Sequence, residues 1–193
     1  MKKKHHHGDL REALINAGIE LLNESDISAL TLRKCAAKAG VSHAAPAHHF
    51  AGLPGLKSAI AARGTDKLAQ TMQHEIDNTE DQPYKRLEAM CNGYLMFALA
   101  NPALTNLMFN LQNVCLESTH SGRSNSSAYK ILVDCCAPFK QQNTPSQVTQ
   151  LAVWSMIHGY SQLALLGQID PHNQHINFAD LLAQLHLQLE ETP

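Results

Sequence analysis

Three histidines stand close together in the segment KAGVSHAAPAHHF, residues 38–50, as His43, His48 and His49. Imidazole side chains bind zinc, transfer protons in catalysis and hydrogen-bond to charged partners. A zinc site is disfavoured, because neighbouring residues of a helix diverge by about 100°. The segment also contains no carboxylate or cysteine that could complete a tetrahedron. The sequence therefore predicts neither a metal ion nor a cofactor, and it leaves contact with a polyanion as the remaining chemistry.

The other reactive side chains form no catalytic pattern. The sequence contains no GxSxG, HExxH or glycine-rich phosphate loop, which are the local signatures of common enzyme sites. The cysteines include one adjacent pair but no C-x-x-C pair, and we expect reduced, mostly buried thiols, with a redox sensor as the alternative. They are Cys35, Cys91, Cys115, Cys135 and Cys136. The sequence therefore predicts that the protein is not an enzyme.

The composition is that of a soluble globular protein. The chain has 193 residues, of which 44% are hydrophobic and 17% are charged. It has no apolar run of the ~20 residues needed to span a membrane, and no apolar run follows the basic start MKKKHHHG. We therefore expect a cytoplasmic protein with no membrane partner.

Charge is distributed unevenly along the chain. Residues 1–64 carry nine Lys or Arg and five Asp or Glu, whereas the remainder carries six basic and twelve acidic residues. A basic N-terminal third on an acidic body indicates a polyanion-binding head, with chance asymmetry as the alternative. Residues 2–7 (KKKHHH) are expected to belong to a flexible basic arm, and a purification tag or a tail without a role are the alternatives.

Periodic apolar residues predict about nine helices and no convincing strand, so the expected fold class is all-α. Asp9, Thr31 and Ser42 are candidate N-caps, and Gly40 is suited to a helix C-terminus. Prolines are expected at or near the starts of later helices. The predicted helices cover approximately residues 9–24, 31–39, 43–50, 54–79, 83–100, 102 onward, 128–138, 145–167 and 178–190.

Residues 31–50 are typical of a helix, a tight turn and a second helix. Leu32, Cys35, Ala36 and Ala39 recur at helical spacing on one face, and Gly40 supplies the turn. Such a motif places its second helix in the DNA major groove, where its N-terminal residues contact base edges. The helix N-termini expected at Thr31 and Ser42 direct backbone N–H groups toward phosphates.

The first ~65 residues resemble the DNA-binding domain of the TetR (TetR/AcrR) family of transcriptional regulators. The body resembles that family's ligand-binding type named after its Trp, His and Gly, here Trp154, His158 and Gly159 in WSMIHGY. The residues that carry the first resemblance are Leu10, Ala13, Leu14, Ala17, Leu21, Thr31, Leu32, Ala36, Ala39, Gly40, Val41, Ser42, Ala44, His49, Phe50 and Leu56.

The resemblance implies an all-α homodimer whose three-helix heads bind a palindromic operator in double-stranded DNA. A small-molecule effector bound in the larger helical body changes the spacing of the heads, and in most members it relieves repression. Three domains are expected: a flexible basic arm at residues 1–8, a helix-turn-helix domain at 9–53, and an effector-binding and dimerisation domain at 54–193.

The expected DNA-contacting residues surround the turn. His43 is expected at bases or phosphates, His48 near the DNA backbone, and His49 in packing at the junction of head and body. The complete set is Thr31, Arg33, Lys34, Ser42, His43, Ala44, Ala45, Ala47, His48 and Lys57.

The chain departs from the family pattern at three positions that usually contact the DNA phosphate backbone. Ala47 stands where the family usually has Tyr, His48 where Arg is frequent, and Leu53 where a Lys is familiar. Weakened phosphate contact leaves a dimeric helical adaptor or sensor, with weak or no DNA binding, as the alternative function.

Two further residue sets are expected in the body. An apolar effector pocket is expected at Tyr94, Phe97, Met108, Phe109, Trp154 and His158, although His158 is equally suited to a structural hydrogen bond in the core. A helix that is apolar nearly all round is buried on several sides, so the last two long helices are expected to form a four-helix interface between two subunits. That interface is expected at Ile157, Gln162, Leu165, Leu166, Leu181, Leu182, Leu185 and Leu189.

Overall fold

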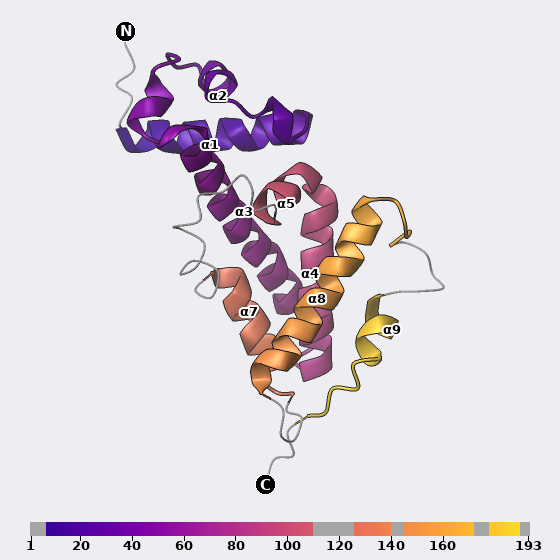
Figure 1. The fold of residues 1–193 in the computed structure, drawn as a ribbon. Helices are drawn as coiled ribbons and strands as arrows, with labels where there is room; N and C mark the ends of the chain where they lie inside the picture. Colours follow the sequence, from indigo (N-terminus) through magenta and orange to yellow (C-terminus); the bar gives the residue numbers. More distant parts are fainter. Residues whose placement is uncertain (1–6, 110–125, 140–144, 172–177, 190–193) are drawn as a thin grey trace. The chain divides into compact units, whose positions relative to one another are not determined.

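The computed structural model describes residues 7–109, 126–139, 145–171 and 178–189, and these residues form an all-α protein (Figure 1). Eight α-helices and two short 3₁₀ helices lie in these ranges, compared with the expected total of about nine. The α-helices are α1 (His7–Glu24), α2 (Leu32–Lys38), α3 (Gly52–Asp77), α4 (Pro83–Ala100), α5 (Pro102–Phe109), α7 (Ser127–Cys136), α8 (Ser146–Leu165) and α9 (Phe178–Ala183). The 3₁₀ helices are η1 (Ile27–Ala29) and η2 (Ala45–His48).

Several of these boundaries agree with the cap residues identified in the sequence. Pro83 and Pro102 are the first residues of α4 and α5, where a missing N–H removes no helical hydrogen bond. Asp9 lies inside α1 and is not its N-cap, because the helix begins at His7. The expected arm at residues 1–8 lies outside the described residues, apart from the two residues that open α1.

The chain divides into two compact units, and the division differs from the expected boundary at residue 53. The first unit contains α1, η1, α2, η2 and α3 as far as Thr65, and it also includes α5. The second contains the rest of α3 together with α4, α7, α8 and α9. Residues 102–109, assigned to the effector domain from the sequence, therefore group with the N-terminal helices.

The first unit is built around the apolar side of α1. Leu14 and Ile15 of α1, Cys35 of α2 and Leu56 of α3 are almost completely buried, and burying each large apolar side chain stabilises the fold by about 1.5–3 kcal/mol. The helix α5 packs on α1 and η1, and Leu104 is fully buried there. These contacts give the N-terminal helices a core of their own.

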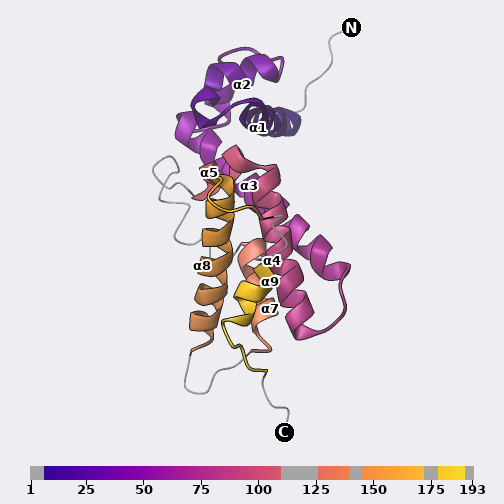
Figure 2. The same ribbon diagram turned by 90° about the vertical axis from the view of Figure 1, so that its right-hand side faces the viewer.

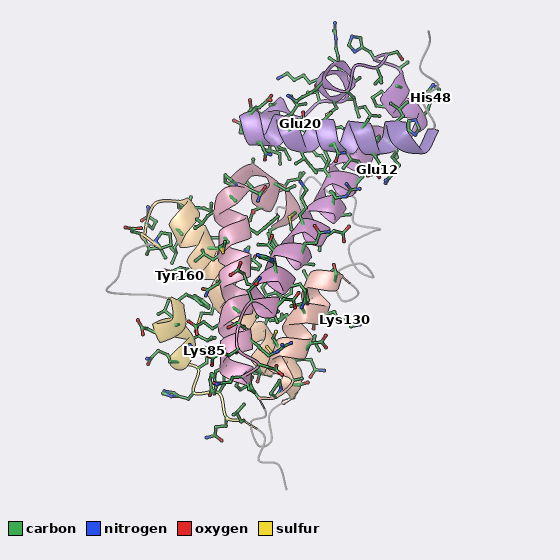
Figure 3. The ribbon with its side chains drawn as sticks, turned by 180° about the vertical axis from the view of Figure 1, so that it is seen from behind. Glu12, Glu20, His48, Lys85, Lys130 and Tyr160 are labelled. Carbon is green, nitrogen blue, oxygen red and sulfur yellow. The ribbon has the colours of Figure 1, made fainter. Side chains whose placement is uncertain are left out.

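Charged residues of α1 connect it to the other helices of the first unit. The Lys38 ammonium at the end of α2 lies 2.6 Å from a carboxylate oxygen of Glu24 and 3.6 Å from one of Glu20. Arg63 of α3 pairs with Glu12. Glu12 and Glu20 are labelled on α1 in Figure 3. Exposed pairs of this kind contribute little energy each, so they orient the helices more than they stabilise them.

The second unit is a bundle in which α8 lies along α4 and α7 (Figures 1 and 2). Leu87 and Met90 of α4 and Val153 and Ile157 of α8 are buried in its core. Helix α4 approaches the end of α3 very closely at Gly93. A Cβ atom added to Gly93 would lie 2.7 Å from the Met72 Cα and 2.9 Å from the Thr71 carbonyl oxygen.

The C-terminal segment corrects a prediction. The helix expected over residues 178–190 ends at Ala183, and His186 adopts a φ of 46°. Beyond it, Leu187 is buried, its carbonyl accepts a hydrogen bond from the Tyr84 hydroxyl, and Leu189 forms an isolated bridge with Phe139. These contacts require an extended chain, and they override the helical spacing of the leucines. No strand is present in the described ranges.

The close approach at Gly93 predicts a strong packing effect. Gly93→Ala is expected to lower the free energy of unfolding by about 1–3 kcal/mol, because backbone atoms of α3 cannot move aside for the added methyl group. Asn92→Ala, at the exposed neighbouring position of α4, is the control, and its stability is expected to stay the same or rise. Urea denaturation followed by circular dichroism measures both variants, and equal midpoints would contradict the prediction.

Candidate DNA-binding surface and effector site

The first expected helix-turn-helix element is present with its predicted caps. The Thr31 side chain accepts a hydrogen bond of 3.2 Å from the Lys34 N–H at the start of α2. At the other end, Gly40 has a φ of 69°, its N–H bonds to the Ala37 carbonyl, and the Val41 N–H bonds to the Ala36 carbonyl. This pair of bonds is the Schellman arrangement, and it confirms both the Thr31 cap and the Gly40 turn.

The second element is shorter than predicted. The sequence favoured a helix capped by Ser42, whereas η2 begins at Ala45, and its cap residue Ala44 makes no side-chain capping bond. The Ala45, Ala47 and His49 N–H groups bond three residues back, to the carbonyls of Ser42, Ala44 and Pro46. Pro46 causes this arrangement, because its ring clashes with the carbonyl four residues before it in an α-helix.

Most of the residues expected to contact DNA are exposed around this turn. His48, on η2, is labelled in Figure 3. The Thr31, Ala45 and Lys57 side chains are half-buried. The exposed ones are Arg33, Lys34, Ser42, His43, Ala44, Ala47 and His48.

The end of the short η2 segment is held against α1 by a contact that the sequence did not reveal. The Arg11 guanidinium lies over the Phe50 ring, 5.5 Å from its centroid, and Phe50 is buried. The His49 ring, expected at the head–body junction, lies beside Phe50 in this unit with ring centroids 6.5 Å apart. Cation–π contacts of this kind contribute about 0.5–1 kcal/mol at exposed sites, so Arg11 helps to position the turn.

In the second unit, the expected effector residues of α4 and α8 come together. The Tyr94 hydroxyl is 2.8 Å from the His158 Nδ1, and it also takes part in a hydrogen bond with Trp154. Burial raises the pKa of Tyr94, an effect that the bond to Trp154 partly offsets. Burial lowers the pKa of His158. Both groups are therefore neutral at physiological pH.

A second tyrosine supports the same side of α8. The Tyr129 ring of α7 lies 6.0 Å from the Trp154 ring, and the Tyr129 hydroxyl donates a hydrogen bond of 3.2 Å to the Gln150 side chain. Residues 150, 154, 158 and 161 follow helical spacing, so they share one side of α8. Gln150 and Ser161 were not among the residues predicted from sequence, although their helical spacing relative to Trp154 and His158 indicates a shared side.

Two other expected pocket residues group with the first unit. Met108 and Phe109 belong to α5, in the first unit. There a Cβ added to Gly64 would lie only 2.6 Å from the Met108 sulfur, so Met108 packs tightly on α3. Phe97 is buried in α4. The sequence could not separate these residues, because apolar spacing does not reveal which unit a helix joins.

The outward side of α8 is apolar although it is exposed. Ile157 and Leu182, expected at a subunit interface, are instead buried in the protomer's own core. Gln162, Leu165, Leu181 and Leu185 are half-buried, and Leu189 is exposed. The large apolar residues exposed on α8 are Val148, Leu151, Leu163 and Leu166.

Metal and thiol chemistry receive no support from the parts of the chain that the structure describes. No group of three or more His, Cys, Asp or Glu residues there could hold a metal ion. Cys35, Cys91, Cys135 and Cys136 are buried free thiols, and Cys115 lies outside the described residues. Burial raises the pKa of Cys35 and Cys135 to about 11 and that of Cys136 to about 12. These thiols are protonated and poorly reactive.

None of the described helices is long and apolar enough to cross a bilayer.

Solved structures with the same fold span almost the whole chain. A protein of unknown function from Rhodococcus sp. RHA1 is 24% identical, with a TM-score of 0.75 and coverage of 95% of each chain. A TetR family transcription regulator from Marinobacter aquaeolei VT8 is 18% identical, with a TM-score of 0.68, and covers 93% of this chain and 96% of its own. The transcriptional regulator FadR from Bacillus subtilis, in complex with stearoyl-CoA, is 12% identical, with a TM-score of 0.66 and coverage of 90% and 94%.

Sequence comparison identifies the family. No curated protein is recognisably similar to the chain. Residues 87–186, more than half of the chain, match the model of the tetracyclin repressor-like C-terminal domain. This match covers α8 and the Tyr94–His158 pair, and the first unit supplies the turn of α2 and η2 found in the sequence. The protein is therefore a transcription regulator of the TetR family.

Proposed function

We propose that the protein is a homodimeric, cytoplasmic repressor that binds palindromic operator DNA and is released by a small, largely apolar effector. The observation that carries the proposal is the exposed segment after Gly40. There Ser42, His43 and Ala44 are exposed directly beyond a Schellman turn, which is where a helix-turn-helix protein presents its base-contacting residues.

The exposed residues suggest a division of roles on DNA. Arg33 and Lys34, near the N-terminus of α2, suit phosphate contacts, which position the protein without reading sequence. His43 and Ser42 offer hydrogen bonds, and Ala44 offers a small apolar surface that can meet a thymine methyl group. Lys57, one turn into α3, is a further phosphate partner.

The outward side of α8 supports dimerisation. Val148, Leu151 and Leu166 are exposed to water by 51%, 63% and 70%, and large apolar residues exposed along one side of a helix suit an interaction site. A Cβ at Gly159, on the same side, would meet nothing within 4 Å. Small residues between large apolar ones let two copies of α8 approach closely. Leu189 and the half-buried Leu165, Leu181 and Leu185 complete the proposed interface.

The effector site is proposed at Tyr94, Phe97, Trp154 and His158. In the solved complex, the Bacillus subtilis FadR of the same fold holds stearoyl-CoA, which supports ligand binding by this kind of body. The effector acts by binding more tightly to the protein conformation that fits DNA poorly. In the DNA-binding conformation, the two reading segments are spaced by about one DNA turn, ~34 Å, or a multiple of it.

A gel shift with the DNA upstream of the protein's own gene tests DNA binding. Lys34→Ala is expected to weaken binding to all sequences and to lower the slope of log affinity against log salt by about one. Lys67→Ala, an exposed lysine of the second unit, is the control and should leave both unchanged. No shift with wild-type protein, together with tight capture of a protein partner, would instead support the adaptor function.

Because Ala47 and Leu53 replace residues that usually contact phosphates, the DNA affinity is expected to depend only weakly on salt concentration. Leu53→Lys adds one cation where relatives carry a lysine, and it is expected to steepen the salt slope by about 0.9, the value for one more neutralised phosphate. Fluorescence anisotropy at several salt concentrations measures the slope. Ala59→Lys, a half-buried position farther along α3, is the control. An unchanged slope for Leu53→Lys would show that this position does not face the phosphates.

Introducing negative charge on the exposed side of α8 tests the proposed dimer interface. Leu151→Glu combined with Leu166→Glu is expected to convert the dimer to a monomer at micromolar concentration, because two buried carboxylates without partners oppose association strongly. Met96→Glu places the same charge at another exposed apolar residue of the second unit and should remain dimeric. Sedimentation velocity measures the mass, and a dimeric double variant would place the interface elsewhere.

A further inference from the structure

One polar group inside the second unit lacks a hydrogen-bond partner. Ser161 of α8 has 0% of its surface exposed, and its hydroxyl makes no hydrogen bond to any described residue. Leaving a buried hydroxyl unsatisfied costs about 1–3 kcal/mol. A group of this kind is a candidate ligand contact, because a ligand can supply the missing partner.

The position of Ser161 connects it with the Tyr94–His158 pair. Ser161 lies three residues after His158 and seven after Trp154, so all three occupy one side of α8. From α4, Tyr94 contacts both His158 and Trp154. The result is a short row of polar groups, buried at Tyr94 and Ser161 and half-buried at Trp154 and His158, among apolar residues. A few polar groups in apolar surroundings are typical of a small-molecule site.

The charged groups near these polar residues determine which ligands the site can bind. Helix α8 contains no Asp, Glu, Lys or Arg, and the neighbouring Tyr94 and His158 are neutral. On α7, Lys130 and Asp134 are exposed to solvent. On α4, Arg86 pairs with Asp81 and Lys85 pairs with Glu88. Helix α9, which also packs on α8, contributes the acidic Asp180. An anionic ligand group would therefore be buried without a counter-charge, which is strongly unfavourable.

We propose that Ser161, together with Tyr94, Trp154 and His158, binds a neutral and largely apolar small molecule through a hydroxyl or carbonyl group. The Ser161 hydroxyl donates to the ligand oxygen, and it accepts in turn when that oxygen belongs to a hydroxyl. Anionic ligands of the same size are rejected. The inference rests on the proposed function only in naming this molecule as the effector.

The fluorescence of Trp154 can report ligand binding at this site. Trp154 is the only tryptophan in the chain, so a change in its fluorescence reports ligand binding next to Tyr94. The probes are two matched pairs, 1-decanol with decanoate and 2-phenylethanol with phenylacetate, titrated at pH 7.5 into the full-length protein. At least one alcohol is expected to produce a saturable change, with its carboxylate binding at least about ten-fold more weakly, a difference of about 1.4 kcal/mol.

Substitution at Ser161 separates a binding role from a structural one. Ser161→Ala is expected to weaken alcohol binding by about three- to ten-fold and to leave the melting temperature of the free protein equal or higher, since it removes an unsatisfied hydroxyl. Ser155→Ala, on the exposed side of the same helix, is the control and should change neither quantity.

Three results would overturn the inference: saturable binding of neither alcohol, carboxylates that bind as tightly as their alcohols, or a Ser161→Ala variant with unchanged affinity. The gel shift reports separately on the proposed function. If an alcohol binds but does not release the protein from DNA, the ligand site is supported and the alcohol's role as effector is contradicted. If the protein binds DNA but binds neither alcohol, the ligand site is contradicted and the proposed DNA-binding function is not.

Discussion

The hydrogen bond between Tyr94 and His158 is the interaction on which the organisation of the larger unit depends. Helix α8 carries no Asp, Glu, Lys or Arg, and it packs on both α4 and α7. Polar residues on the sides that face these helices are therefore covered by them. Buried polar groups are tolerated when they are paired. Tyr94 pairs with His158, and Tyr129 pairs with Gln150. Each neighbouring helix thus supplies one tyrosine hydroxyl, which fixes the rotation of α8 about its axis.

This rotation determines what the two sides of α8 can do. Successive residues of a helix are about 100° apart, so the half-buried Trp154 and His158 lie on the side toward Tyr94, while Val148 and Ser155 are exposed on another side. In the proposed dimer, one rigid helix therefore carries ligand contacts and subunit contacts. A ligand that rotates or shifts α8 would change the dimer geometry directly, and no longer path through the core is required.

Local sequence signals predicted the parts of the fold that local chemistry decides. Thr31, Gly40, Pro83 and Pro102 mark helix ends through their own hydrogen-bonding or φ preferences, and each lies where it was expected. The all-α class followed from periodicity in the same way. Tyr94, Trp154 and His158 were expected in one pocket, with a structural hydrogen bond as the alternative for His158. The bond between His158 and Tyr94 fits that alternative as well.

The remaining features depend on contacts between distant residues, which periodicity does not report. The leucines of residues 178–189 have helical spacing, but Tyr84 and Phe139 hold the chain beyond Ala183 in another conformation. Met108 and Phe109 were expected in the pocket with Tyr94, and the helix that carries them, α5, packs on α1 within the first unit. Ser161 was overlooked because its importance lies in a missing hydrogen bond, which only a three-dimensional structure reveals.

In the N-terminal unit, one proline limits the surface that can reach DNA. Pro46 restricts η2 to a single short turn, so fewer side chains project from it than from a full α-helix. Three of the exposed side chains around the turn, Ser42, Ala44 and Ala47, are short and carry no charge. In the proposed DNA complex, affinity would then come largely from cations outside the turn, such as Arg33 and Lys34, while Arg11 stacked on Phe50 holds the turn in place. The proposed regulator would gain its affinity from phosphates and leave discrimination to a few small contacts.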